Sequence, residues 1–242
     1  MTRYLVLLLL LAGLLLGSAL PAAAQDRTRE TRSVDAFTEV GLSVPGTLHL
    51  RQGTSRSVEV EAAPTVLEHL ETTVDGGRLE IRDASNWFDR MFGGDDRDWG
   101  PIDVYVTAPT YEVVALAGSG AVVGETPLEG ETLALKNAGS GRLTLEVAVR
   151  DLTVSIAGSG AAELRGTAET VAVEIAGSGT VDGLDLRTAT ATIDVAGSGD
   201  THIHVTDRLS ATLMGSGDVT YRGSPTTDTS ILGSGRVRAA SE

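Results

Sequence analysis

Apolar and polar residues alternate along most of the second half of the chain, in blocks that repeat. In the block "LTVSIAGSGAAELRG", Val154 and Ile156 precede a Gly-Ser-Gly motif and Ala162 follows it with the same parity. Alternation with a period of two is typical of a β-strand with one buried face. The block therefore predicts strands whose even positions, counted from the first glycine of the motif, face a core.

The Gly-Ser-Gly motif occurs seven times, with its first glycines separated by 21, 19, 19, 20, 18 and 18 residues. These glycines are Gly118, Gly139, Gly158, Gly177, Gly197, Gly215 and Gly233. A repeat of this period indicates a solenoid, and its glycine pairs and β-branched residues disfavour helices. We therefore predict an all-β protein: a single-stranded parallel β-helix with coils of about 19 residues, each containing two or three short strands.

The motif also predicts how the wall of the solenoid is built. If the chain runs straight through it, both glycines face inward and the serine faces outward, so that the wall can bend or approach the opposite wall. One inward position is polar, because Asn137 stands where the neighbouring coils have Leu116 and Ile156. Asn137 either begins an asparagine ladder or marks an irregular coil. The lack of asparagine at this position elsewhere favours an irregular coil.

Residues 34–112 also alternate, but without the motif, in "FTEVGLSVPGTLHLRQG", "SVEVEA" and "GGRLEIRD". We predict that they form an irregular β-rich N-terminal part of the same domain, which caps the solenoid of residues 113–242. Within this part, "PTVLEHLETTV" predicts a short capping helix, and residues 83–100, with "SNWFDRMFGGDDRDWG", predict a surface loop. At the other end, Arg236 and Arg238 place charge on the last strand, which opposes edge-to-edge pairing.

The first 24 residues have one basic residue, a leucine-rich run and three alanines before Gln25. This pattern predicts a signal peptide over residues 1–24, followed by a linker over 25–33. No cysteine stands at the junction, so a lipoprotein is not expected. No later segment is apolar enough to predict a membrane span. The protein is therefore expected to be exported, to the periplasm, the outer surface or the medium.

Charge and cysteine content exclude several classes of function. The chain carries 33 acidic and 19 basic residues, a net charge of −14; without Arg3 of the predicted signal peptide the balance is 18 minus 33, or −15. Such a chain repels phosphate backbones, so nucleic acid is not an expected partner. There is no cysteine, which excludes disulfides, thiolate nucleophiles and cysteine-based metal sites.

One set of residues is a candidate metal site. Asp200, His202 and His204 alternate on one strand, and the repeat places Asp182 beside His202 and Asp218 beside Asp200 on adjacent coils. Side chains on adjacent coils lie within about 5 Å, and carboxylates and imidazoles bind Zn²⁺. The alternative is a solvated outer face.

The glycine motifs match neither the dinucleotide fingerprint nor the hydrolase elbow. We therefore expect no catalytic residue and no cofactor.

The segments "FTEVGLSVPGTLHLRQG", "GGRLEI" and "IDVYVTAP", followed by the AGSG coils, resemble the bacterial GIN-domain family from about Phe37 to Val237. Members of that family are described as auto-transporter adhesin heads. The resemblance implies an exported β-helical domain at the cell envelope and supplies no catalytic residues.

These observations favour a non-catalytic, adhesion-like binding module for a surface ligand, whether glycan, matrix or protein. A structural or self-assembling envelope spacer is the alternative. A carbohydrate-active β-helix enzyme is a third hypothesis, but the outward positions of the repeat are mostly small, and no catalytic set recurs in it.

Overall fold

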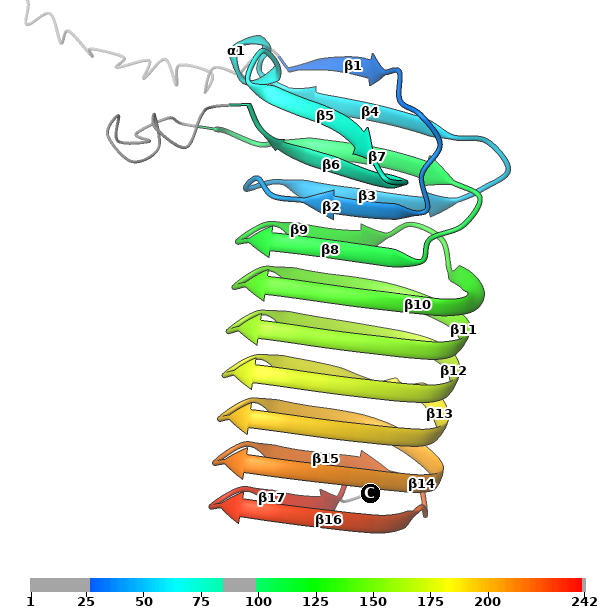
Figure 1. The fold of residues 1–242 in the computed structure, drawn as a ribbon, viewed down its shortest axis with the longest axis vertical. Helices are drawn as coiled ribbons and strands as arrows, with labels where there is room; N and C mark the ends of the chain where they lie inside the picture. The colour runs from blue at the N-terminus through cyan, green and yellow to red at the C-terminus, as the bar shows by residue number, and fades with distance from the viewer. Residues whose placement is uncertain (1–26, 85–98, 241–242) are drawn as a thin grey trace, which may run out of the picture.

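The computed structural model describes residues 27–84 and 99–240, which form a long column with a cap at one end (Figure 1). The expected signal peptide and most of the expected loop at 83–100 lie outside these residues. The column contains twelve strands: β2 (Glu39–Leu42), β3 (Thr47–Gln52), β8 (Val113–Gly118), β9 (Ala121–Gly124), β10 (Leu128–Gly139), β11 (Arg142–Gly158), β12 (Ala161–Gly177), β13 (Thr180–Gly197), β14 (Asp200–Gly215), β15 (Asp218–Arg222), β16 (Thr226–Gly233) and β17 (Arg236–Ala239). The cap contains β1 (Thr28–Arg32), β4 (Ser57–Ala62), α1 (Pro64–Leu67), β5 (Leu70–Asp75), β6 (Arg78–Asp83) and β7 (Asp103–Ala108).

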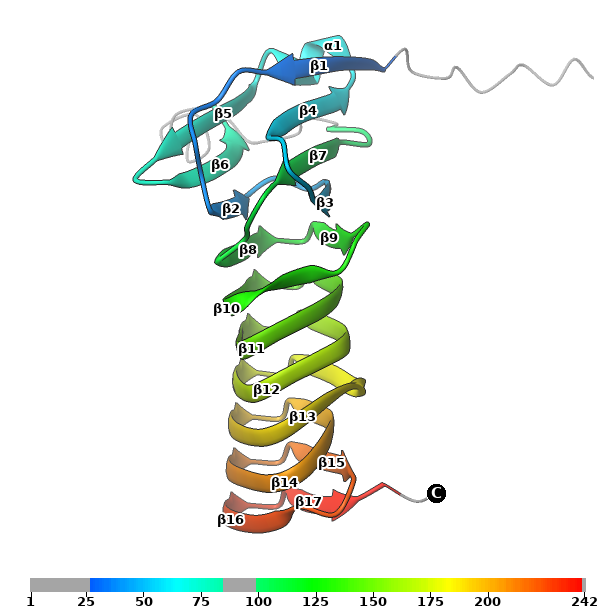
Figure 2. The ribbon, with the colours of Figure 1, turned by 90° about the vertical axis from the view of Figure 1, so that its right-hand side faces the viewer.

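The column is the predicted parallel β-solenoid, with about 7 turns and coils of about 19 residues. Each coil has two faces. The Gly-Ser-Gly motif forms the corner between them on one side, and on the other side a long strand continues around a rounded edge (Figure 2). β11, for example, runs without interruption for 17 residues. A coil therefore contains fewer and longer strands than the short ones predicted.

Equivalent residues of successive coils stack in register. Leu135 pairs with Val154, which pairs with Val173, and all three are buried, as the alternation predicted. Asn137 is buried between Leu116 and Ile156, and its side-chain amide donates a hydrogen bond to the carbonyl oxygen of Gly141 at 2.7 Å. No asparagine ladder forms at this position, and Asn137 instead bonds the backbone of its own corner.

The chain turns at the motif, so the straight course considered from the sequence does not occur. The first glycines have φ between +98° and +140°, where glycine is strongly favoured. The second glycine is buried and the serine exposed, as predicted. The first glycine instead packs along the column, because a Cβ atom on Gly158 would lie 2.5 Å from the carbonyl oxygen of Gly139. That same oxygen accepts a hydrogen bond from the amide of Ser159 at 2.9 Å.

The N-terminal part supplies one complete coil of the solenoid. β2 and β3 pair in parallel with β8 and β9, so Leu42 lies beside Leu116 and Thr47 beside Ala121. The corner of this coil is Ser43-Val44-Pro45-Gly46, in place of a Gly-Ser-Gly motif. On the other side, β6 and β7 pair in parallel with β2 and β3. The coil is thus enclosed between the cap and the repeat.

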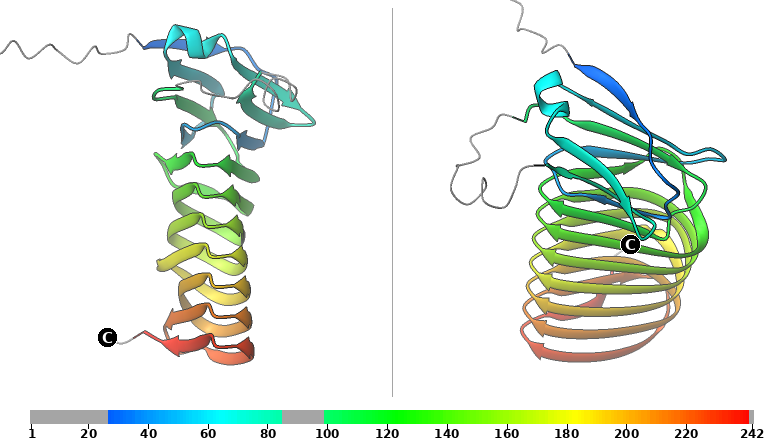
Figure 3. Two further views of the ribbon diagram at one scale, coloured as in Figure 1. Left: turned by 90° about the vertical axis from the view of Figure 1, so that its left-hand side faces the viewer. Right: turned by 45° about the horizontal axis from the view of Figure 1, so that its top comes forward.

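The cap changes the column from parallel to antiparallel pairing (Figure 3). β4 pairs antiparallel with β7, and β1 pairs antiparallel with β4. Residues 28–32 are therefore a strand and not part of a linker, because they complete the edge of β4 and Arg29 pairs with Glu59 and Glu61. The predicted helix is a single turn, since the residues after it form β5, which pairs with β6.

Within the described residues, no helix is long and apolar enough to cross a membrane.

Candidate functional site

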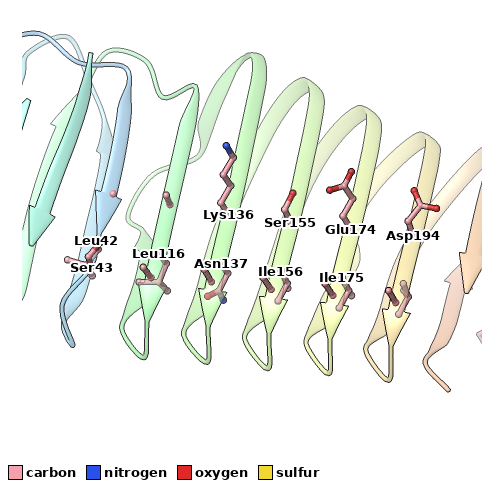
Figure 4. Close-up of a pocket in the computed structure, with 18 of the residues that line it drawn as sticks. Leu42, Ser43, Leu116, Lys136, Asn137, Ser155, Ile156, Glu174, Ile175 and Asp194 are labelled. Carbon is pink, nitrogen blue, oxygen red and sulfur yellow. The ribbon is translucent and has the colours of Figure 1, made fainter. Parts of the chain in front are cut away.

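A groove of about 620 Å³ runs along the column on the outer face of the strands that lead into the corners (Figure 4). It begins at β6, crosses β2, β8, β10, β11, β12 and β13, and reaches β14. Each of these strands contributes the same few positions, so the groove is a product of the stacking register. A single coil contributes only one narrow segment of it.

Small residues form the floor of the groove. The residue before the motif is an exposed alanine in five successive coils, and these alanines stack in register. They are Ala117, Ala138, Ala157, Ala176 and Ala196. The next coil has Met214 at this position, with an exposed fraction of 53%. The floor is therefore flat, apolar and open to solvent.

A row of polar side chains follows one side of the floor. Lys136, Ser155, Glu174 and Asp194 occupy equivalent positions on four successive coils and point away from the strands (Figure 4). Lys136 is the only lysine of the sequence. Within the described parts of the chain, Lys136, Glu174 and Asp194 form no ion pair or side-chain hydrogen bond.

Charges of opposite sign lie at different places along the row. Glu174 and Asp194 lie directly beside each other on neighbouring coils, whose backbones are about 5 Å apart. The two carboxylates are therefore neighbours. Lys136 lies two coils from Glu174, at about 10 Å by the same spacing. At the cap end, Arg78 of β6 pairs with Glu39 at 2.8 Å and Glu80 at 3.5 Å. Free carboxylates therefore mark one part of the groove and a free amine marks another.

The lining of the groove offers two kinds of contact. None of the described residues that line it is a histidine or an aromatic residue, so Ser43 and Ser155 have no imidazole beside them in the lining. Its floor offers apolar contact over several coils, and its side row offers charge pairing. This combination fits an extended ligand that lies along the column.

The five residues of the candidate metal site are only partly brought together. Asp182 lies beside His202, as the repeat predicted, and the Asp200 carboxylate accepts a hydrogen bond from the Asp218 amide at 2.9 Å. The Asp218 carboxylate in turn accepts one from the Arg236 amide at 3.0 Å. Within residues 27–84 and 99–240, no group of three or more such side chains could hold a metal ion. The candidate site therefore stays a sequence prediction without a formed centre.

His204 lies in a cationic environment that the repeat count did not reveal. A shift of register after Gly183 places Arg187 beside His204, and Arg222 lies beside it on the next coil. Burial lowers the pKa of His204 below 6.5, and the two guanidinium groups lower it further. Two fixed positive charges oppose the approach of a metal cation.

A second polar cluster joins the cap to the first coil and was not found from the sequence. His49 lies 3.1 Å from Asp103 and stacks on Tyr105 at 4.6 Å, while Arg29 covers the same ring at 4.1 Å. Burial raises the pKa of Asp103, but hydrogen bonds from Arg27 and His49 outweigh this, and the pKa is lowered overall. The cluster depends on the strand β1, which the sequence pattern assigned to a linker. Its groups bind one another and hold β1 in place.

The family model for the putative auto-transporter adhesin head GIN domain matches residues 36–225. The chain belongs to this family. The match covers the first coil, most of the cap and most of the solenoid, including every coil that forms the groove. Among curated proteins, none matches the chain.

Several solved structures have the same fold. A putative adhesin of Bacteroides fragilis is 21% identical, with a TM-score of 0.82, over 90% of this chain and 98% of its own. A putative lipid-binding protein of Parabacteroides distasonis is 20% identical, with a TM-score of 0.70, over 89% and 97%. A putative adhesin of Parabacteroides merdae is 18% identical, with a TM-score of 0.67, over 89% and 96%. The GIN-domain column is thus shared at low sequence identity.

Proposed function

We propose that this GIN-domain protein is an exported, non-catalytic binding module of the cell envelope, and that its ligand lies in the groove along the column. The groove is the observation that carries the proposal, because it combines an apolar floor over five coils with charged groups that have no partner in the described protein. The description of the family as an adhesin head supports a binding role. The pattern of residues 1–24 supports export.

The ligand that this groove fits best is an extended polypeptide segment with apolar side chains and a basic residue. Apolar side chains would cover the alanine floor, and a basic group would neutralise Glu174 and Asp194, which stand side by side. A glycan is less well matched, since no aromatic residue of the described part of the chain lines the groove. A lone acyl chain is less well matched as well, because the floor is open and lipid sites bury most of their ligand.

The test is retention of the purified protein on immobilised matrix proteins, on a glycan array and on phospholipid vesicles. Ala157→Glu places a bulky charge on the floor. Ala148→Glu is the matched control, an exposed alanine of the same strand that does not line the groove. We expect retention on protein surfaces, a loss of at least tenfold for Ala157→Glu, and no loss for Ala148→Glu. Retention on glycans or vesicles alone, or equal retention of the two variants, would refute this proposal.

A separate probe follows from the single lysine. An amine-reactive reagent modifies only Lys136 and the N-terminal amine, so the rate of modification at Lys136 reports directly on occupancy of the groove. A bound polypeptide should slow that rate, whereas the rate at the N-terminal amine should stay constant. An unchanged rate under saturating ligand would place the ligand elsewhere on the molecule.

A further inference from the structure

The two ends of the column are built differently. At the N-terminal end, β1, β4 and α1 lie across the solenoid and cover it (Figure 3). At the C-terminal end, β16 pairs only with β14 and β17 pairs only with β15 among the described strands. The outer edges of β16 and β17 therefore present unpaired backbone N–H and C=O groups. All eight residues of β16 are exposed.

The apolar surface of the protein gathers at this same end. The three large exposed hydrophobic residues of the described chain are Met214, Ile231 and Leu232, with exposed fractions of 53%, 43% and 75%. Ile231 occupies a core-facing position and stacks on the buried Leu213. Among the described residues, nothing covers the interior of the column at its C-terminal end.

The longer edge strand, β16, lacks the devices that usually prevent strands from pairing. Proteins block exposed edges with proline, lysine or bulges, and β16 contains no proline or lysine and pairs with β14 in continuous register. Arg236 and Arg238, which the sequence pattern assigned to edge protection, lie on β17, where both approach Asp218 of the preceding coil, at 3.8 Å and 3.9 Å. Their charge is thus partly neutralised within the column.

We propose that two copies of this protein associate end to end, the last coil of one against the last coil of the other, through antiparallel backbone pairing of the exposed edges. An open coil can pair with a surface that has an unpaired strand edge and an exposed apolar interior. Within the described molecule, only the C-terminal end has both features. The other open edges among the described strands are β1 and β5, with the sequences TRETR and LETTVD. Both belong to the cap, so they present charged residues and no open interior. A two-fold arrangement uses the same surface on both copies and stops at the dimer.

Charge favours this arrangement over a lateral one. The whole chain carries a net charge of −14, whereas residues 226–239 contain two arginines and one aspartate. Contact through the last coils thus avoids bringing two acidic columns side by side and keeps them pointing away from each other. The contact is small, since it involves two strands of 8 and 4 residues, so it should be weak and concentration-dependent.

Sedimentation of the purified protein between about 5 µM and 500 µM tests the proposal, because a weak contact populates the dimer only at the upper end of this range. We expect the mean mass to rise toward twice that of the monomer, and Leu232→Glu to weaken association at least tenfold. Leu232 is mostly exposed, so this variant should fold, which circular dichroism checks. Ala148→Glu adds the same charge far from the end and should associate as the unaltered protein does. The proposal is overturned if the protein is still a monomer at 500 µM, or if Leu232→Glu associates as strongly as the unaltered protein.

Cross-linking gives the geometry, because the natural chain has no cysteine. With a short bis-maleimide, Leu232→Cys should yield a covalent dimer at high concentration, and Ala117→Cys, near the cap, should not. Dimers from Ala117→Cys but not from Leu232→Cys would overturn the end-to-end arrangement. The groove variant Ala157→Glu should associate normally, which separates this proposal from the binding function.

Discussion

Substitution of one corner glycine tests the account of the motif. In Gly158→Ala, the new Cβ atom would lie 2.5 Å from the carbonyl oxygen of Gly139 and 3.2 Å from its carbonyl carbon. The residue would also keep a φ of +122°, which alanine rarely adopts. Both effects act on the native state, and the neighbour that must move is backbone held in the stack. The strand can therefore not relieve the contact by changing a rotamer.

The expected cost follows from these two effects. A non-glycine residue in such a backbone region costs about 1–3 kcal/mol, and displacing packed neighbours costs about as much again. Alanine also lowers the conformational entropy of the unfolded chain, which stabilises the folded protein by about 0.4–1 kcal/mol and offsets part of this cost. The net loss of unfolding free energy is thus about 2–5 kcal/mol, a large part of the 5–15 kcal/mol typical of a domain.

Gly130→Ala is the matched control for this experiment. Gly130 lies in β10, its φ is not in the left-handed region, and a Cβ atom there would meet nothing within 4 Å. Its stability should stay within about 0.5 kcal/mol of the natural protein or increase slightly. Urea unfolding followed by circular dichroism measures both variants. If Gly158→Ala unfolds at the same urea concentration as Gly130→Ala, the corner is not the tight stack described above.

Three further predictions concern buried and titrating groups. Asn137→Leu should raise the unfolding free energy by about 1 kcal/mol in urea titrations, because its Oδ1 atom has no partner in the described structure and the Gly141 carbonyl keeps a backbone donor. Asp103 has a lowered pKa, so its stabilisation is present above pH 4 and is lost as the pH falls through the folded pKa; Asp103→Asn should flatten the acid limb of the stability–pH curve. His204 also has a lowered pKa, so protonating it destabilises the fold as the pH drops below 6.5. Its NMR titration midpoint should lie below 6.5 and rise in Arg222→Ala, and its signals should not shift on addition of Zn²⁺ at neutral pH.

The solenoid could be predicted from the sequence because each coil repeats one burial pattern. Val154 and Ile156 before the motif and Ala162 after it are all buried, and this parity alone specifies strands with a common core. The corner could not be predicted from the same parity. A straight strand and a turn of this length both leave the following residue on the inward side, so the φ of Gly158 had to come from the structure.

The candidate sites were less predictable, because they depend on register across coils. The alanines of the groove floor are visible in each AGSG, but their alignment into one continuous surface depends on pairing between strands. The metal hypothesis counted positions from the first glycine of each motif, which placed Asp182 beside His202 correctly. The shift of register after Gly183 is not visible in that count, and it puts Arg187 beside His204. The strand β1 was missed because its charged residues resemble a linker until Arg29 is seen to bind Glu61, and Arg27, just before the strand, to bind Asp103.

Because the groove is built from stacked coils, its length depends on the number of coils. Each coil adds about 4.8 Å of floor, and each contacts only the coils before and after it. Duplication of a single unit of 18 to 20 residues between two corners would lengthen the floor by one step and leave the cap and the last coil unchanged. Length and chemistry of the binding surface are therefore separately adjustable. If the ligand lies in the groove as proposed, gain or loss of whole coils would set how long a ligand fits, and single changes in the row from Lys136 to Asp194 would set which charges it must carry.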